Sequence, residues 1–296
     1  MNSDNTDHIS VSVIVPAFNA ETTIGLCLEA VQGARPFEIL LIDDGSTDRT
    51  NEIAEKYGAR ILKTQGRSGP AAARNIGALE ARGNVLFFVD ADVQMYRNTV
   101  DRVREAFAGD PSLDALIGSY DDSPADPDFL SQYKNLMHCY VHQRGRSEAS
   151  TFWSGCGAIR RDVFLANSGF SNDYSRPAIE DIELGYRLVQ AGRKIRLDHD
   201  LQVKHLKRWT FWGLVKTDIF DRGIPWSELI LRDRNMPNDL NLQLSQRVSV
   251  ALVYLLVAVA LAVAIRWKGY ILIPGYVAVF LLLSRRGKTV STSDPG

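Results

Sequence analysis

The sequence predicts an α/β fold built on a mostly parallel, doubly wound sheet. Residues 37–42 and 85–89 are almost wholly apolar, as strands covered by helices on both faces tend to be. Asp44 follows the first run closely, and Asp90 and Asp92 follow the second. Apolar runs also alternate with amphipathic stretches, which is typical of a sheet with helical crossovers. These acidic side chains are therefore expected to meet at one edge of the sheet, beyond the carboxyl ends of its strands.

The individual elements follow in order along the chain. Short apolar runs predict strands at residues 11–15, 37–42, 60–62 and 85–89. Amphipathic stretches between them predict helices at residues 21–31, 47–57 and 71–81. After a polar stretch rich in Pro and Asp, a further helix is expected at residues 129–142. Residues 154–158 have small side chains, which permit close approach of the backbone to a ligand or a tight strand crossing.

The last predicted elements of this domain surround a pair of acids. Glu180 and Asp181 precede an amphipathic helix expected at residues 182–191, which Gly192 ends. Residues 194–197 then return as a strand.

Composition narrows the classes of function. The 296 residues are 45% hydrophobic, which suits one large domain with an appendage. A net charge of -1 provides no electrostatic case for a nucleic-acid partner. The three cysteines form no CxxC pair, so neither a disulfide framework nor a zinc site is indicated, and a reducing compartment is the simpler interpretation. Residues 1–10 are polar and lack the apolar core of a secretion signal, which predicts a short disordered lead.

The C-terminal region differs in character. Residues 248–265 form an uncharged run of about the minimum length that crosses a bilayer, and residues 270–283 form a second apolar run interrupted by Pro274. Two membrane segments are therefore expected within residues 247–284, with a buried core helix and strand as the alternative. The basic and polar tail at residues 285–296 would then lie on the side of the main domain, which favours a cytoplasmic location for that domain.

The acids at the strand ends suit one kind of ligand in particular. An Asp-x-Asp beside a second acidic strand end can hold a divalent cation, either Mg or Mn, together with the diphosphate of a nucleotide. The alternative is that these acids are solvated turn residues.

Several ordered blocks resemble those of the family-2 glycosyltransferases. The blocks lie at residues 13–19 (VIVPAFN), 42–48 (IDDGSTD), 69–77 (GPAAARNIG), 89–92 (VDAD), 155–161, 169–170, 180–181 and 192. The resemblance covers about residues 11–209. It implies a catalytic domain with the nucleotide-sugar-binding GT-A fold, a sheet that is mostly parallel and doubly wound, and an inverting sugar transfer.

The resemblance also implies roles for the residues of the first blocks. Side chains expected to line the base and ribose pocket are Pro16, Ala17, Asn19 and Asp44. Arg74 would help to hold the nucleotide, although an ion pair with an acidic neighbour is its alternative role. Asp90 would approach the ribose or the metal with its bound water, and Asp92 would bind the cation directly.

The later acidic pair matches the place from which the family draws its catalytic base. Asp181 is the expected base, with Glu180 beside it, because inversion needs a carboxylate that takes the proton of the attacking hydroxyl. The alternative is that both acids only favour the positive end of the following helix.

A further motif, HLKRW at residues 205–209, stands where processive relatives such as cellulose and hyaluronan synthases carry Gln-x-x-Arg-Trp. The leading Gln is His205 here, so processive synthesis of a polymer is not expected. His205 would bind the cation or the diphosphate, or serve a structural role instead, and Arg208 and Trp209 would belong to the nucleotide-sugar site. Aromatic residues then recur through residues 209–226, and residues 210–246 are expected to lie at a membrane interface or in the core.

Together these features predict an inverting, metal-dependent transferase that moves a single sugar from a nucleotide-sugar donor to a lipid-linked or glycan acceptor. Its expected location is the cytoplasmic face of the inner membrane. Two alternatives stay open: a sugar-phosphate nucleotidylyltransferase, and a membrane-tethered module that binds a nucleotide sugar without turning it over. The sequence leaves the sugar, the acceptor, the choice of cation and the oligomeric state open.

Overall fold

A computed structural model describes residues 9–174, 179–233, 240 and 247–267. The chain divides into two compact units, Met1–Asn241 and Leu242–Gly296. The disordered lead expected at residues 1–10 lies mostly outside the described residues. So do the second apolar run, the basic tail and much of the segment between residues 234 and 246.

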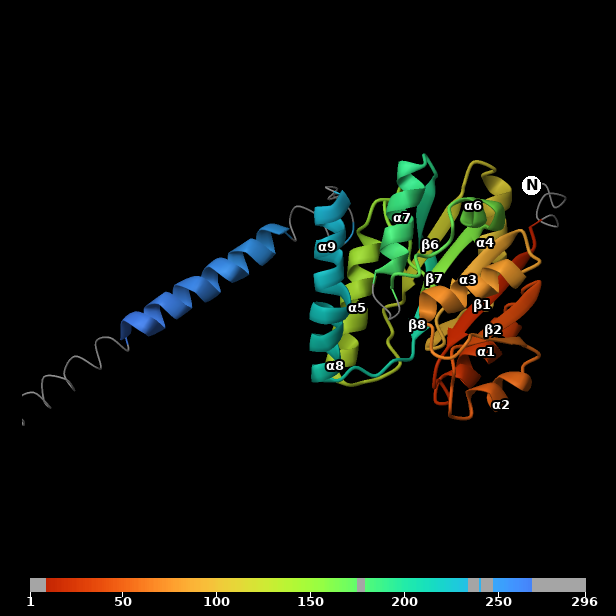
Figure 1. The fold of residues 1–296 in the computed structure, drawn as a ribbon, viewed down its shortest axis with the longest axis horizontal. Coiled ribbons are helices and arrows are strands. Elements are labelled where there is room, and N and C mark those ends of the chain that lie inside the picture. The colour runs from red at the N-terminus through yellow and green to blue at the C-terminus, as the bar shows by residue number, and fades with distance from the viewer. Residues whose placement is uncertain (1–8, 175–178, 234–239, 241–246, 268–296) are drawn as a thin grey trace, which may run out of the picture. The chain divides into compact units, whose positions relative to one another are not determined.

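The first unit is built around a single sheet, with strand order β3-β2-β1-β4-β7-β6-β8-β5 among the described residues (Figure 1). The strands are β1 (Val11–Ala17), β2 (Glu38–Asp43), β3 (Arg60–Lys63), β4 (Val85–Val89), β5 (Val93–Met95), β6 (Ala115–Tyr120), β7 (Cys156–Arg160) and β8 (Ile195–His205). The helices are α1 (Ile24–Gly33), α2 (Thr50–Glu55), α3 (Pro70–Glu80), α4 (Thr99–Gly109), α5 (Phe129–Gln143), α6 (Arg161–Ala166), α7 (Glu180–Gln190), α8 (Phe211–Lys216) and α9 (Ile224–Asp233), with the π-helix η2 (Thr217–Gly223) between the last two.

Both faces of the sheet are covered, as the apolar strands predict. Successive residues of β4 point in opposite directions: Phe87 packs in the core layer that contains α1 and α4, and Phe88 packs in the layer that contains α3, α6 and α7. Strand β1 alternates in the same way, with Val13 on the first side and Ile14 on the second. All four side chains are fully buried. The doubly wound α/β architecture is therefore confirmed.

The sheet is parallel from β3 to β4 and mixed beyond that point. Strand β7 pairs antiparallel with both β4 and β6, and β8 runs parallel to β6. Neither β6 nor β7 was predicted as a strand. The strand predicted at residues 194–197 is too short, because β8 continues to His205. The polar residues Asp198 and Asp200 interrupt the apolar pattern there, but Arg102 forms ion pairs with both acids and the strand continues through them.

Two other boundaries differ in ways that affect the site. The predicted helix at residues 47–57 is only Thr50–Glu55, because side-chain hydrogen bonds to Asp43 and Asp48 hold the preceding residues in a turn. Helix α7 begins at Glu180, so Glu180 and Asp181 lie in its first turn instead of before it.

Helices α8 and α9 and the π-helix between them belong to the first compact unit and lie beside α5, away from β2 (Figure 1). Lys134 of α5 forms an ion pair with Asp218 of η2 at 2.5 Å, and just before α8 the Trp209 amide donates to Ser131 Oγ of α5 at 2.8 Å. Large apolar side chains on the segment are exposed, including Trp212, Phe220 and Leu231. In the second unit, Arg247–Trp267 is a helix of 21 residues with the length and apolar composition of a membrane span, and none of its side chains is buried.

Candidate functional site

The carboxyl ends of β1, β2 and β4 open onto a cavity of about 730 Å³. Its walls carry most of the residues that the sequence placed at a nucleotide: Pro16, Ala17, Asn19, Asp44, Arg74, Asp90, Asp92 and Arg208. Segments as far apart in the chain as residues 16 and 208 thus meet at one place.

Asp44 organises the floor of this cavity. One of its carboxylate oxygens accepts from Thr64 Oγ1 at 2.9 Å and from the Ser68 amide at 2.7 Å, and the other accepts from the Gly69 amide at 2.9 Å. These bonds hold residues 64–69 against the end of β2 and set the start of α3. Asp44 is 5% exposed, so the carboxylate is largely enclosed by its partners.

Asn19 shapes the opposite wall. Its backbone is in the left-handed region, with φ of 49°, and its side-chain oxygen accepts from the Thr47 amide at 2.8 Å. This conformation is one that Asn adopts more readily than most residues. Next to it, the Arg67 guanidinium lies over the Phe18 ring at 4.1 Å, and both side chains line the cavity. A planar group can stack in such a place.

Arg74 joins the donor side of the site to the acidic pair on α7. Its guanidinium lies 2.7 Å from Asp90 and 2.9 Å from Glu180, and the residue is only 4% exposed. The ion pairing weighed as its alternative role is thus present, but with acids that converge from β4 and α7. Helix α3 carries Arg74 close to the sheet because Gly77 allows it: a Cβ there would lie 2.5 Å from Ile14.

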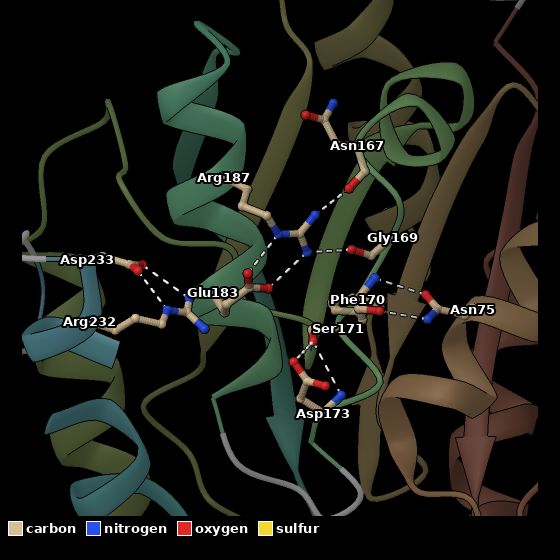
Figure 2. A network of polar contacts seen from close by, with 10 residues as sticks. All are labelled: Asn75, Asn167, Gly169, Phe170, Ser171, Asp173, Glu183, Arg187, Arg232 and Asp233. Atoms are coloured by element: carbon tan, nitrogen blue, oxygen red, sulfur yellow. Dashed lines mark hydrogen bonds and ion pairs between the residues drawn. The ribbon is translucent and has the colours of Figure 1, made fainter. Parts of the chain in front are cut away.

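A loop between α6 and α7 fixes the relative position of α3 and α7 (Figure 2). Asn75 exchanges two hydrogen bonds with the backbone of Phe170, at 2.8 and 2.9 Å. From α7, Arg187 donates to the carbonyl oxygens of Asn167 and Gly169 and pairs with Glu183 (Figure 2). Because both helices hold the same loop, the guanidinium on α3 meets the carboxylate of Glu180 in a defined geometry.

A second cavity, of about 820 Å³, shares part of its wall with the first. Asp92 and Asp181 both line it, together with Arg74 and Asp90. The two acids that the sequence placed on either side of a reacting centre are therefore brought to one space.

Asp181 has a firmly held carboxylate. Ser154 donates to Oδ2 from its amide at 3.1 Å and from its hydroxyl at 3.2 Å, and the Ile182 amide donates to Oδ1 at 2.8 Å. Burial, together with the nearby charge of Glu180, raises the pKa of Asp181 to about 6. Gly185 brings α7 this close, since a Cβ at that position would lie 2.2 Å from the Phe152 amide nitrogen. Such a group accepts a proton near neutral pH.

Asp92 and His205 form the candidate cation site. His205 Nε2 lies 3.5 Å from Asp92 Oδ2, and the ring is stacked on Tyr120 with centroids 4.2 Å apart. Burial raises the pKa of Asp92, but the stronger combined effect of the His205 hydrogen bond and nearby charges holds it below its usual value. Asn135 Oδ1 lies 2.5 Å from His205 Nδ1, so Nδ1 donates to it, and Nε2 is the ring nitrogen that faces Asp92.

Where Nε2 carries no proton, it and Asp92 Oδ2 are two acceptor atoms 3.5 Å apart, and such a pair suits a cation. Within the described part of the chain, however, no group of three or more His, Cys, Asp or Glu side chains could hold a metal ion. Asp92 and His205 would thus be two protein ligands for Mg or Mn, and further oxygens, such as those of a diphosphate, would be needed to complete the shell. Asp90, the other predicted ligand, has one oxygen engaged by Arg74.

The last two predicted residues, Arg208 and Trp209, line different cavities. Arg208 lines the first cavity with a side chain that is 76% exposed, and its nearest acid is Asp126 at 3.8 Å. Trp209 is buried and lines only the second cavity. Arg208 thus lies at the first cavity, and Trp209 lies at the second, which Asp181 also lines.

Several residues at the site were not identified from the sequence: Phe18, Arg67, Asn135, Ser154, Lys207 and Arg222. Ser154 stood in a stretch noted only for its small side chains. Phe18 and Lys207 stand within the motifs at residues 13–19 and 205–209 but were given no role there, and Arg67, Asn135 and Arg222 lie in no motif that the sequence offered.

Comparison with known proteins shows consistent similarities. Residues 12–166, slightly more than half of the chain, match the model of the family described as glycosyl transferase family 2. Glycosyltransferase AglE of Haloferax volcanii is 33% identical over 205 residues, which cover 64% of this chain and 65% of AglE. Glycosyltransferase GlyG of Streptococcus pneumoniae is 31% identical over 117 residues, which cover 37% of this chain and 38% of GlyG. The matched region is less than two thirds of either relative.

Solved structures show the same fold at lower identity. The mannosyltransferase PcManGT from Pyrobaculum calidifontis, in complex with GDP-Man and Mn²⁺, superposes with a TM-score of 0.57 at 20% identity, over 73% of this chain and 62% of that one. S. aureus TarS 1-349 in complex with UDP-GlcNAc superposes with a TM-score of 0.55 at 22% identity, over 68% and 60%.

Proposed function

The chain belongs to glycosyl transferase family 2 and has the GT-A fold, and from this premise we propose that it transfers a single sugar from a nucleotide-sugar donor to a lipid-linked or glycan acceptor, with inversion at the anomeric carbon. One observation carries the proposal: Asp92 and Asp181 line the same cavity. One acid is then available to the donor and the other to the acceptor.

The first cavity is the donor site in this proposal. Asp44 and Asn19 face the base and ribose, and Pro16 and Ala17 pack against them. The pair of Phe18 and Arg67 is suited to stack on the base. Support comes from the neighbours of the same fold, whose structures contain GDP-Man and UDP-GlcNAc.

Asp92 and His205 are the proposed ligands of a divalent cation, with Asp90 close to the same position. A cation held there neutralises charge on the departing diphosphate. Mn²⁺ is present in the structures of PcManGT and of GalNAc-T7, which share the fold. Lys207 lines both cavities and supplies a further positive charge.

Asp181 is the proposed base on the acceptor side. The acceptor hydroxyl oxygen attacks the anomeric carbon, its proton passes to the Asp181 carboxylate, and the bond between the anomeric carbon and the nucleoside diphosphate breaks. The bonds from Ser154 orient the carboxylate and leave a lone pair for that proton. Arg74 holds Glu180 and Asp90 in place beside it.

We further propose that Arg247–Trp267 spans a membrane and that the exposed apolar side chains of α8, η2 and α9 lie at its surface. The catalytic unit would then work at the cytoplasmic face, near acceptors carried by lipids.

The decisive experiment incubates the full chain with a panel of UDP and GDP sugars, with and without Mn²⁺, and follows release of the nucleoside diphosphate. The proposal expects release from one donor that requires Mn²⁺ and is lost in Asp92→Asn. Asp181→Asn should bind that donor and fail to transfer the sugar. Release of pyrophosphate from a nucleoside triphosphate would instead favour a nucleotidylyltransferase, and donor binding without turnover would favour a binding module.

A further inference from the structure

One part of the wall of the second cavity is formed by the π-helix η2 and the end of α8. Four residues from this segment line the cavity, Lys216, Thr217, Asp221 and Arg222. Lys216 and Thr217 are neighbours in the sequence, and so are Asp221 and Arg222. Each residue of the first pair lies five positions before its counterpart in the second. In an α-helix, residues five apart are offset by about 140° around the axis and would not share one wall.

The π geometry brings these pairs together. In a π-helix, backbone hydrogen bonds join residues five apart, as the Ile224 amide and the Ile219 carbonyl do here. Lys216 and Asp221 consequently form an ion pair across five positions, at 2.8 Å. Gly223 permits the wider turn, since its Cβ would lie 2.7 Å from the Asp218 carbonyl oxygen. Short π segments are rare and often occur at functional sites.

Arg222 differs from Lys216 and Arg74, because no carboxylate is bonded to it among the described residues. Lys216 is paired with Asp221, and Arg74 is paired with Asp90 and Glu180. Among the described residues, no hydrogen bond or ion pair engages the Arg222 guanidinium. Arg222 and Asp181 line the same cavity.

Arg222 lines only the second cavity, whereas Arg67 and Lys207 line both. Arg67 and Lys207 also form no ion pair among the described residues, but of these three cations only Arg222 is confined to the acceptor side. An arginine that formed an ion pair with Asp181 would lower the basicity of that carboxylate, so the absence of such a bond leaves both groups available to the acceptor.

We propose that Arg222, presented by the π-helix, binds a phosphate group of the acceptor beside Asp181. The acceptor class is then a hydroxyl compound that carries a phosphate or diphosphate, as a lipid-linked sugar or a soluble sugar phosphate does. The phosphate is held and does not react, and the hydroxyl still transfers its proton to Asp181. This inference rests on the proposed transferase function, and it assigns a residue and a chemical group that the function alone does not require.

The test measures binding of phosphate probes to the full chain in detergent, with UDP or GDP and Mn²⁺ present to fill the donor side. Trp153 and Trp209 line the second cavity, so their fluorescence reports on its occupation. The probes are farnesyl phosphate, glucose 1-phosphate and, as the uncharged match of the first, farnesol. Tighter binding of farnesyl phosphate identifies a lipid-borne group, and equal binding of glucose 1-phosphate identifies a soluble one.

Arg222→Gln should weaken binding of the phosphate probe by about tenfold or more, because a hydrogen bond to a charged group is lost. Arg222→Lys, which keeps the charge, should retain much of the affinity. Arg232→Gln is the matched control, since Arg232 lies on α9, pairs with Asp233 and does not line the cavity. Nucleotide binding should be unchanged in all three variants.

Equal affinity of Arg222→Gln and the unchanged protein for the phosphate probe would overturn the proposal. So would farnesol binding as tightly as farnesyl phosphate, or a loss of nucleotide affinity that matches the loss of phosphate affinity. Failure of any nucleotide to bind the unchanged protein with Mn²⁺ would count against the transferase function itself, and is thereby distinguished from failure at Arg222.

Discussion

Asn135 Oδ1 accepts a hydrogen bond from His205 Nδ1 over 2.5 Å, between residues that are 70 positions apart. Asn135 is 1% exposed, so water does not compete for this bond. The amide oxygen can only accept, which requires the proton on Nδ1 and leaves Nε2 free to bind a cation with Asp92. Asn135 thus orients a proposed metal ligand without touching the metal.

Replacing Asn135 should therefore weaken metal binding. We expect Asn135→Leu to reduce the affinity for Mn²⁺ by about tenfold or more, the usual effect of losing a partner of a ligating histidine. The measurement is a titration of free Mn²⁺ by electron paramagnetic resonance. Gln143→Leu is the control, because Gln143 lies on the same helix and bonds to Ser119 and His199 instead. Equal affinities in the two variants would contradict the role of Asn135.

The pH dependence of transfer should follow Asp181. The carboxylate must be ionised to accept a proton, and its pKa is about 6, so kcat should fall as the pH decreases below about 6. Ser154→Ala removes a hydrogen bond to the ionised form, which raises the pKa and should move this fall to higher pH. A pH profile of kcat for both proteins checks this expectation. An unchanged profile in Ser154→Ala would exclude Asp181 as the group observed.

Asp181→Asn should make the protein more stable at pH 8 while it abolishes transfer. The folded pKa of about 6 is above the ordinary value of 3.8, so the ionised carboxylate destabilises the fold increasingly as pH rises from about 4 to 6, and fully above that range. Removing it should raise the free energy of unfolding at pH 8 by an amount on the order of 2 kcal/mol. The difference should vanish below pH 4, where both states are protonated. Thermal unfolding of both proteins at pH 4 and pH 8 checks this expectation. If the substitution only removed contacts, it would destabilise the variant at both pH values.

Breaking the buried ion pairs of Arg74 should be costly. Arg74→Met leaves Asp90 and Glu180 without this guanidinium, and we expect a loss of about 3 to 5 kcal/mol in the free energy of unfolding. Arg74→Lys should recover only part of it, because one ammonium cannot replace a planar group that contacts two acids. The control is Arg60→Met, whose pair with Glu80 is exposed and should change stability by less than about 1 kcal/mol. Denaturant unfolding of the three variants provides the comparison.

The membrane proposal predicts how the chain fractionates. The full chain should remain with membranes after washing with carbonate at pH 11, because an apolar helix such as Arg247–Trp267 is removed only by detergent. A chain that ends at Asn241 should be released by that wash, since only the exposed apolar side chains of α8, η2 and α9 would hold it. Trp212→Ser in the full chain is the control and should stay bound. Release of the full chain by carbonate would contradict a spanning helix.

Local features of the sequence were sufficient for the strands of the fold as far as β4, whereas β5, α4 and β6, which follow it, were not predicted. Strands β1, β2 and β4 are buried on both faces, so their apolar runs were unmistakable, and helix α5 was predicted to within one residue. The ordered blocks around Asn19, Asp44 and Asp92 also indicated the family, because each joins a strand end to its turn within a few positions. Features that depend only on the spacing of residues within a short stretch of chain could be predicted from the sequence.

The geometry of the reacting centre depended on contacts between distant segments. Ser154 meets Asp181 over 27 positions, and Arg74 meets Glu180 over 106. The short form of α2, the continuation of β8 through two acids and the wide turn of η2 also depend on partners elsewhere in the chain, such as Arg102 for β8. Periodicity reports only which side of an element is apolar, whereas the partners of a buried polar group are chosen by the packing of the whole domain.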